Sequence, residues 1–179
     1  MHSFELLSSE LLLEGRSFKL RRDHLKTPDG RRTSYEIVEH GGSVVLLPID
    51  TEGNILFVRQ YRQPAGQELI ELPAGTRNGG ESYEACAARE IREETGMAAG
   101  KMDRIGDFYL APGYSTEFMA VFLATDLSSA PLQADEDEFL QLMKVPARQA
   151  IEMAQHGEVP DAKSLAALFL ARSALQRYL

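Results

Sequence analysis

Cysteine, tryptophan and long apolar runs are scarce or missing in this chain of 179 residues. The lone cysteine, Cys86, cannot form a disulfide within the chain, which is consistent with a reducing cytoplasm. No run of about eighteen apolar residues occurs, so no membrane span is predicted. Residues 1–13 contain leucines without a basic flank before them, and this pattern argues against a signal peptide. A soluble cytoplasmic protein is therefore expected.

Basic residues are outnumbered by acidic residues, 19 to 27, and the formal net charge is −8. This balance disfavours a protein that binds nucleic acid through a broad basic face. A small anionic substrate stays possible, because a bound metal ion can reverse the local charge. Since tryptophan is absent, a ring that stacks on a bound base would come from Phe18, Tyr35 or Tyr114, or an arginine would take its place.

Turns containing glycine or proline divide the chain into short strands and three helices. Strands are predicted at residues 17–25, 33–40, 43–49, 55–61, 68–72, 103–110, 116–125 and 139–145. Helices are predicted at 81–95, ending at Gly96, at 146–156 and at 161–179. Residues 127–137 are expected to form an acidic loop. This order of elements predicts a mixed sheet with helices on its faces, an α/β or α+β sandwich.

Three carboxylates share one face of the predicted helix at 81–95. Glu90, Glu93 and Glu94 are separated by steps of three and four residues, which places them side by side on a helix. By itself such a run is typical of a solvated helix surface. Three carboxylates on one arc also suit a hard divalent cation, which prefers oxygen ligands. Arg89 lies one turn before Glu93 and can pair with it. The neighbouring arc, expected to face the core, carries Ala88, Ile91 and Thr95.

A wider frame of fixed residues surrounds these glutamates. The pattern G-x5-E-x7-R-E-U-x-E-E-x-G-U, in which U is a bulky aliphatic residue, begins at Gly75 and ends at Met97. Every defined position is matched, including Glu81 and Gly96. The segment therefore resembles the Nudix box, and the chain is identified by it as similar to the Nudix hydrolases.

The resemblance implies a fold and a metal site. The implied fold is α+β, an α/β/α sandwich with a mixed central sheet, helices on both faces and an N-terminal antiparallel strand extension. Glu90 and Glu94 match the main metal ligands of the family, and Glu93 matches a position that binds metal or assists the water. Ala74, just before the box glycine, is expected to lend a backbone carbonyl. The implied cofactor is Mg²⁺, for which Mn²⁺ can substitute.

Three further segments resemble the ADP-ribose pyrophosphatase group of this family. Pro112 lies fifteen residues after Met97, the spacing typical of that group, and residues 58–64 and 71–75 also match it. A Pro-Gly pair is also a common turn, so this proline has an ordinary structural explanation too. The resemblance implies hydrolysis of ADP-ribose to AMP and ribose 5-phosphate. The alternatives are a broader nucleoside-diphosphate-sugar hydrolase, acting on an ADP- or GDP-hexose, and a non-catalytic Nudix ligand sensor.

Substrate contacts are expected mainly from polar residues outside the box. The resemblance implies that Arg62 contacts a substrate phosphate, a role that suits a guanidinium because it binds phosphate through two hydrogen bonds. The weaker candidates, several of which also read as ordinary strand-surface or turn residues, are Arg59, Tyr35, Arg22, Pro112, Gly113, Tyr114 and Glu117.

The catalytic base and the subunit arrangement are also implied by the resemblance. In this group the base usually comes from an acidic loop before the last strand, here residues 134–138, and the sequence does not choose between Glu136 and Glu138. A plain solvated loop is the alternative. The N-terminal strands of relatives cross to a partner subunit, so a homodimer is expected, with residues 1–40 as a dimerising region and 41–179 as the catalytic domain.

Overall fold

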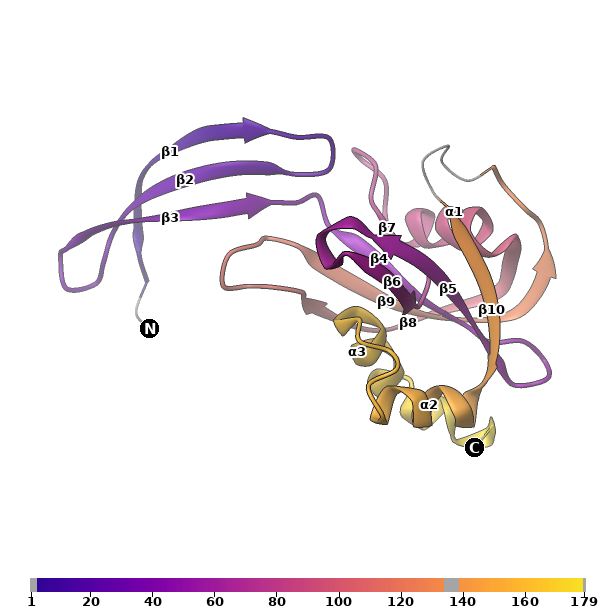
Figure 1. Cartoon of the computed structure of the whole chain (residues 1–179). Helices are drawn as coiled ribbons and strands as arrows, with labels where there is room; N and C mark the ends of the chain where they lie inside the picture. Colours follow the sequence, from indigo (N-terminus) through magenta and orange to yellow (C-terminus); the bar gives the residue numbers. More distant parts are fainter. Residues whose placement is uncertain (1–2, 134–138, 179) are drawn as a thin grey trace. The chain divides into compact units, whose positions relative to one another are not determined.

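The structure is a computed structural model that describes residues 3–133 and 139–178. The chain forms two compact units, Met1–Gly42 with Phe108–Phe118, and Ser43–Asp107 with Met119–Leu179. No helix within the described residues has the length and apolarity needed to cross a membrane. Figure 1 shows the elements of both units.

The first unit contains an antiparallel sheet of order β1-β2-β3, built from β1 (Glu5–Glu14), β2 (Lys19–Lys26) and β3 (Arg32–Glu39) (Figure 1). Strands β2 and β3 were predicted, whereas β1 was not. Its leucines come in adjacent pairs and triplets instead of alternating, so its own pattern does not favour a strand. Pairing with β2 forms it, with register shifts between Leu6 and Ser8 and between Leu11 and Leu13.

The second unit contains two sheets. A four-stranded mixed sheet has the order β7-β4-β9-β8, in which β4 (Ser43–Pro48) runs parallel to β9 (Phe118–Ser129) and antiparallel to β7 (Ala74–Thr76), with β8 (Met97–Tyr109) at the edge. The other sheet is antiparallel, of order β10-β5-β6, from β5 (Asn54–Arg62), β6 (Gln67–Glu71) and β10 (Leu140–Pro146). The 3-10 turn η1 (Gln63–Ala65) joins β5 to β6.

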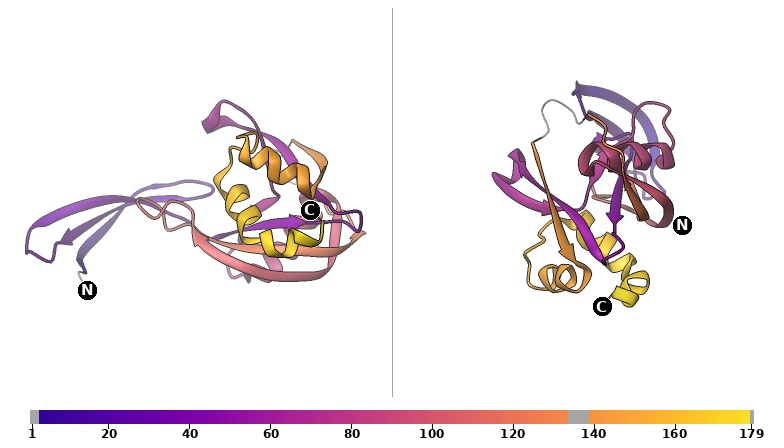
Figure 2. Two further views of the ribbon diagram at one scale, coloured as in Figure 1. Left: turned by 90° about the horizontal axis from the view of Figure 1, so that it is seen from below. Right: turned by 90° about the vertical axis from the view of Figure 1, so that its right-hand side faces the viewer.

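Helices cover both faces of β4. Val44 and Leu46 pack with Cys86, Ala87 and Ile91 of α1 (Tyr83–Thr95), which lies on one face. Because side chains alternate along a strand, the equally buried residues between them face the opposite way, where α3 (Ala162–Leu170) also contacts β4. Helices α2 (Ala147–Gln155), α3 and α4 (Arg172–Leu175) gather on that other side (Figures 1 and 2). The expected α+β architecture is confirmed.

Three local predictions were wrong. The helix expected over residues 161–179 is interrupted at Ala171, whose ψ of −7° breaks the regular ladder, and α4 and the 3-10 turn η2 (Gln176–Tyr178) follow it. The acidic loop begins later than expected, because β9 continues to Ser129 alongside the long strand β8. Ala88 is exposed on α1, whereas Cys86 and Ala87 face the core.

Candidate active site

Helix α1 is capped at both ends, at its C-terminus by the predicted glycine. The Ser82 side chain accepts a hydrogen bond from the backbone N–H of Ala85, an N-cap that satisfies one of the first free donors. At the other end Gly96 has φ 70°, the left-handed conformation that favours glycine, and its N–H bonds the Arg92 carbonyl. The predicted C-terminal cap is confirmed, and the box glutamates therefore lie on a well-defined helix.

Arg89 gathers the carboxylates of the box. Its Nη1 donates to Glu90 Oε1 at 2.6 Å and to Glu93 Oε2 at 2.8 Å, so the predicted pairing with Glu93 is present. Its Nε and Nη2 donate to the two carboxylate oxygens of Glu81 at 3.1 and 3.0 Å. Hydrogen bonding to Glu81, followed by the bonds to the other carboxylates, raises the pKa of Arg89, and Arg89 lowers the pKa of Glu81.

The Glu90 carboxylate lies directly against the backbone of Gly75 on β7. A Cβ added to Gly75 would be 1.8 Å from Glu90 Cδ, far inside any real contact. The glycine at this box position is therefore required by the glutamate, which is itself 7% exposed. Next to it, the Ala74 N–H donates to Glu94 Oε2 at 3.2 Å. Strand β7 and helix α1 thus bring together Ala74 and the three predicted glutamates.

These residues fit a hard divalent cation by donor type. Carboxylate and carbonyl oxygens are the ligands that Mg²⁺ takes, and the cradle beside Gly75 leaves room for Glu90 where a side chain would fill it. Arg89 carries one positive charge, which offsets a third of the charge of Glu81, Glu90 and Glu93. Within residues 3–133 and 139–178, no three acidic, histidine or cysteine side chains already converge in a metal-holding geometry. Several carboxylates are instead turned toward Arg89.

Arg62, the predicted phosphate contact, is bound by Glu71, a residue for which the sequence predicted no role. Its Nε and Nη2 donate to the two oxygens of Glu71 at 2.9 and 2.7 Å, and its side chain is 39% exposed. Hydrogen bonding to Glu71 raises the pKa of Arg62, and the charge of Glu94 contributes to that rise. The Glu94 carboxylate therefore acts electrostatically on Arg62, which links this arginine to the box.

Glu71 also accepts a hydrogen bond from Lys163 of α3, at 2.5 Å. Both residues are buried, with 1% and 7% of their surface exposed. Burial alone raises the pKa of Glu71, but its bonds to Arg62 and its interaction with Lys163 outweigh burial and hold the pKa below its ordinary value. The one sequence signal for this site is a lysine inside an otherwise apolar helical run, A-K-S-L-A-A-L.

Arg59 and Arg62 lie on opposite faces of β5. Both neighbouring strands pair with β5 in an unshifted register, and side chains three residues apart on such a strand point to opposite sides. The two side chains therefore leave the strand on opposite sides, and the substrate contact predicted for Arg59 stays a prediction.

The remaining substrate-contact candidates lie in the first unit. Arg22 stands between two acidic residues of the neighbouring strands, with Nε 2.8 Å from Glu36 Oε1 and Nη1 3.2 Å from Glu10 Oε1. Tyr35 is 48% exposed and makes an edge contact with Phe4, with ring centroids 6.0 Å apart. Arg22 thus already stabilises the sheet through cross-strand ion pairs.

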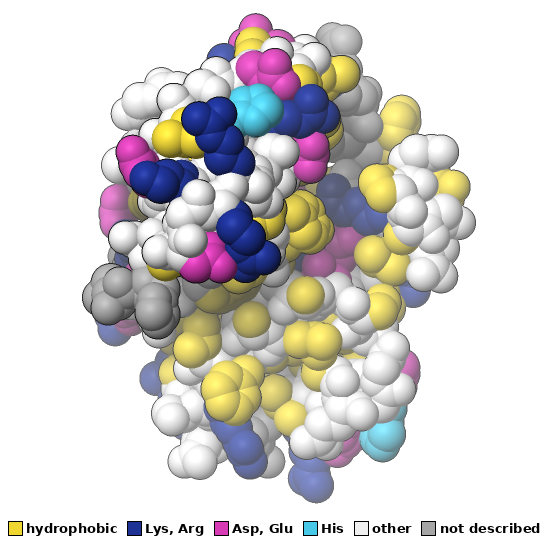
Figure 3. Space-filling view, turned by 90° about the vertical axis from the view of Figure 1, so that its left-hand side faces the viewer, with side chains coloured by type: hydrophobic (Ala, Val, Ile, Leu, Met, Phe, Trp, Pro, Cys, Tyr) yellow, Lys and Arg dark blue, Asp and Glu magenta, His cyan; other side chains and the backbone are white. Residues whose placement is uncertain are grey.

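Figure 3 shows acidic and basic side chains interspersed on one face of the molecule.

The segment with Pro112 extends the N-terminal sheet. The Val38 N–H of β3 donates to the Tyr114 carbonyl at 2.8 Å, and the Thr116 N–H donates to the Val38 carbonyl at 3.0 Å. Pro112, Gly113 and Tyr114 are exposed and Glu117 is half-buried.

The candidate bases Glu136 and Glu138 lie outside the described residues.

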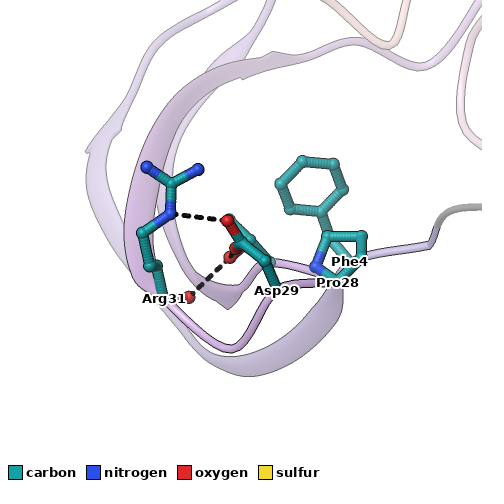
Figure 4. Close-up of a pocket in the computed structure, with 5 residues that line it drawn as sticks. Phe4, Pro28, Asp29 and Arg31 are labelled. Atoms are coloured by element: carbon teal, nitrogen blue, oxygen red, sulfur yellow. Dashed lines mark hydrogen bonds and ion pairs between the residues drawn. The ribbon is translucent and has the colours of Figure 1, made fainter.

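A hollow of about 400 Å³ lies at the turn between β2 and β3 (Figure 4). It is lined by Phe4, Thr27, Pro28, Asp29 and Arg31, none of which was predicted to belong to the site. Its two charged side chains bond each other, Arg31 Nε to Asp29 Oδ2 at 2.8 Å. Its lining thus contains neither the box glutamates nor Arg62.

Cys86 lies on the buried face of α1. It is fully buried, and burial raises the pKa of its thiol to about 12. A thiol with that pKa stays protonated at neutral pH, and the thiolate is the reactive form. Cys86 is therefore part of the buried core that packs between α1 and the sheet.

Comparison with known proteins supports the assignment of the box. The NUDIX domain model matches residues 39–169. The chain is 37% identical to an ADP-ribose pyrophosphatase of Bacillus subtilis (strain 168), with 90% of this chain and 89% of that protein covered. An ADP-ribose pyrophosphatase of Mycobacterium tuberculosis is 39% identical over 92% of this chain and 81% of its own length. A GDP-mannose pyrophosphatase of an Enterobacter strain is 32% identical over 78% of this chain and 81% of that protein.

Solved structures agree with the sequence relatives. The crystal structure of an ADP compounds hydrolase superposes with a TM-score of 0.85, covering 97% of this chain and 95% of that chain at 26% identity. The domain model spans most of the chain, and the relatives are similar over nearly their whole lengths. The chain therefore belongs to the NUDIX family.

Proposed function

We propose that this protein hydrolyses the diphosphate linkage of ADP-ribose, giving AMP and ribose 5-phosphate, with Mg²⁺ as cofactor. The observation that carries the proposal is the complete glutamate cluster of α1, held against Gly75, in a chain whose relatives include ADP-ribose pyrophosphatases. A bound Mg²⁺, or Mn²⁺ in its place, supplies positive charge that neutralises the diphosphate and makes a water more acidic.

The proposed roles of the protein groups come from the resemblance to the Nudix hydrolases. Glu90, Glu94 and the Ala74 carbonyl are the proposed metal ligands, and Glu93 binds metal or orients the water. The diphosphate is otherwise inert, because its own negative charge repels a nucleophile. Glu136 or Glu138 is the proposed general base, which accepts the proton of the attacking water.

Arg62 is the proposed phosphate contact. Glu71 uses the Nε and Nη2 side of its guanidinium, which leaves the edge between Nη1 and Nη2 for a second partner. A guanidinium edge presents two parallel N–H groups and binds phosphate through both. The Arg62 side chain is partly exposed, so a ligand that enters from solvent can reach it.

A broader nucleoside-diphosphate-sugar hydrolase is the second candidate. The similarity to a GDP-mannose pyrophosphatase favours it, because that enzyme cleaves the same kind of linkage next to a different base and sugar. A non-catalytic ligand sensor is disfavoured by the intact set of Glu90, Glu93 and Glu94 beside Gly75.

A substrate panel separates these functions. The purified protein is incubated with Mg²⁺ and ADP-ribose, ADP-glucose or GDP-mannose, and nucleoside monophosphates are separated by chromatography, with a chelator as control. Strong preference for ADP-ribose supports the first proposal, and similar rates on all three support the broader one. Release of no monophosphate from any substrate, together with tight binding of ADP-ribose by calorimetry, would establish the sensor instead.

We also infer a homodimer formed through the N-terminal strands, with residues 1–40 as the dimerising region and 41–179 as the catalytic domain. Every residue of β1 is exposed, and apolar side chains are frequent among them. Phe4, Leu6 and Leu11 are each about half exposed, at 48%, 58% and 56%. Exposed apolar side chains in this number on one strand are typical of an interface. The free, buried Cys86 supports a cytoplasmic location.

A further inference from the structure

Glu71 is the centre of a buried charge network that none of the proposed chemical steps uses. Its residue is 1% exposed, and its carboxylate accepts hydrogen bonds from both Arg62 and Lys163. Arg62 reaches it from the end of β5. Lys163, which is 92 residues beyond Glu71 in the chain, reaches it from the first turn of α3.

The network continues into the N-terminus of α3. Asp161 caps this helix by accepting the Ser164 N–H at 3.0 Å, and it also lies 2.9 Å from Lys163 Nζ. The Ser164 hydroxyl accepts the Leu72 N–H at 2.7 Å, one residue past Glu71. The helix start is therefore attached to the end of β6, two residues before Ala74.

Packing alone does not explain charged groups at this place. Removing a carboxylate and an ammonium from water costs free energy that their attraction often does not recover, and apolar residues of similar size frequently stabilise a fold as well. A buried pair is better explained when it serves something beyond stability. Here the Glu71–Lys163 pair contacts Arg62, and the Nη1–Nη2 edge of that guanidinium is directed away from Glu71.

The pair restricts the orientation of Arg62. A free arginine side chain samples many rotamers, whereas two parallel hydrogen bonds to one carboxylate fix both the position and the plane of the guanidinium. Lys163 holds the same Glu71 oxygen, Oε2, that accepts the Arg62 Nη2 bond. Removal of the lysine would leave that oxygen with one fewer partner, and the carboxylate would be held less firmly.

We propose that Glu71 and Lys163 are positioning residues, which hold the guanidinium of Arg62 in place for a phosphate of the nucleoside-diphosphate substrate. This inference rests on the proposed function, in which Arg62 is the phosphate contact. It predicts that the buried pair influences hydrolysis through Arg62 and through no other group.

A double-mutant cycle tests the inference. The variants are Arg62→Met, the charge-balanced Glu71→Gln/Lys163→Met, and all three changes together, with Ser164→Ala as matched control. The control removes a bond at the same junction of β6 and α3 without changing the charge of the network. For each protein, kcat/KM for ADP-ribose, the dissociation constant of ADP-ribose by calorimetry and the thermal unfolding midpoint are measured.

Arg62→Met is expected to lower kcat/KM by about 10- to 100-fold, the range for loss of a charge-assisted hydrogen bond. The charge-balanced pair is expected to lower it by about tenfold when Arg62 is present, and by less than about twofold in the Arg62→Met background. The Ser164→Ala control is expected to lower the unfolding midpoint while kcat/KM stays within about twofold of the unchanged protein.

The opposite results separate the two ideas. An equal loss from the pair in both backgrounds, or no loss in either, would overturn the positioning role and leave the proposed function standing. An unchanged rate in Arg62→Met would overturn the phosphate contact and the positioning role together. If the unchanged protein releases no AMP, the proposed hydrolysis fails. The dissociation constants of ADP-ribose are then compared in the same cycle. If the fold-losses of affinity from Arg62→Met and from the charge-balanced pair multiply in the combined variant, the positioning role is overturned. If they do not multiply, the positioning role is supported.

Discussion

The carboxylate of Glu90 occupies the space that a side chain on Gly75 would need. An added Cβ would lie 1.8 Å from Glu90 Cδ and within 2.3 Å of both carboxylate oxygens. The two residues are fifteen positions apart in the chain and meet where β7 passes α1. The contact explains physically why a glycine begins the box.

Gly75→Ala is therefore expected to displace the Glu90 carboxylate or shift β7. We expect a loss of about 1–3 kcal/mol of unfolding free energy from overpacking, and a fall of about 100-fold in kcat/KM from misplacement of the glutamate. Chemical denaturation and steady-state kinetics measure the two effects.

Gly79→Ala is the matched control in the same loop. A Cβ there meets no atom within 4 Å, and Gly79 is not among the glycines with positive φ. Its effect on unfolding should stay within about 0.5 kcal/mol. If Gly75→Ala behaved like this control, the close contact would not constrain the site.

Glu94→Gln should leave the fold intact and lower turnover by about 100-fold or more, because a neutral amide is a much weaker ligand for a hard cation than a carboxylate. The measurement is kcat at saturating Mg²⁺, with circular dichroism as a check on folding. Glu84→Gln, at an exposed position in the first turn of the same helix, is the control. Normal turnover in Glu94→Gln would show that the metal assignment is wrong.

Glu136→Gln or Glu138→Gln is expected to slow the chemical step by about 10²- to 10⁴-fold, the usual contribution of a general base. Binding of Mn²⁺, followed by calorimetry, should be preserved, since the base is not a metal ligand in the proposal. Normal turnover in both single variants and in the double variant would place the base elsewhere in the chain.

Acid should weaken the fold partly through Glu71. Its pKa lies below the ordinary 4.5 in the folded protein, so the unfolded chain takes up a proton first as pH falls. The stability that this carboxylate contributes is fully present above pH 4.5 and is lost as pH falls from there through the lower folded pKa. Urea unfolding curves, recorded between pH 3 and 7 at steps of about one pH unit, measure this loss of unfolding free energy.

The charge-balanced Glu71→Gln/Lys163→Met variant isolates that contribution, because glutamine has no proton to gain. The difference in unfolding free energy between the unchanged protein and the variant should be constant above pH 4.5 and should shift in the variant's favour below it. A difference that does not depend on pH would mean that Glu71 is not held in its charged form by the fold.

The exposed leucines of β1 should control assembly. Light scattering during gel filtration is expected to give twice the chain mass of 19.9 kDa, and Leu6→Glu/Leu11→Glu should reduce it to one chain, because buried unpaired charge opposes association. Phe169→Glu, at an apolar residue of α3 that is 73% exposed, controls for a general effect of surface charge. A monomer in the unchanged protein would contradict the inferred dimer.

The sequence by itself determined the parts whose partners lie nearby in the chain. Glu90, Glu93 and Glu94 share a face because helical geometry depends on spacing, and Ser82 and Gly96 mark the ends of α1 because capping is local. The pairing of Arg89 with Glu93 follows from the same rule, since the two are one turn apart. The resemblance to the Nudix box rests on such fixed spacings.

Tertiary structure alone decided the contacts between distant segments. No pattern within β6 or α3 shows that Glu71 and Lys163 meet, because their pairing depends on how the helix docks beside the sheet. Strand β1 likewise forms by pairing with β2, against its own irregular pattern. The partner of Arg62 therefore depends on tertiary packing, whereas the shared face of the glutamates depends only on the helical repeat. The reason is that spacing along a chain determines local geometry but does not determine how distant segments dock.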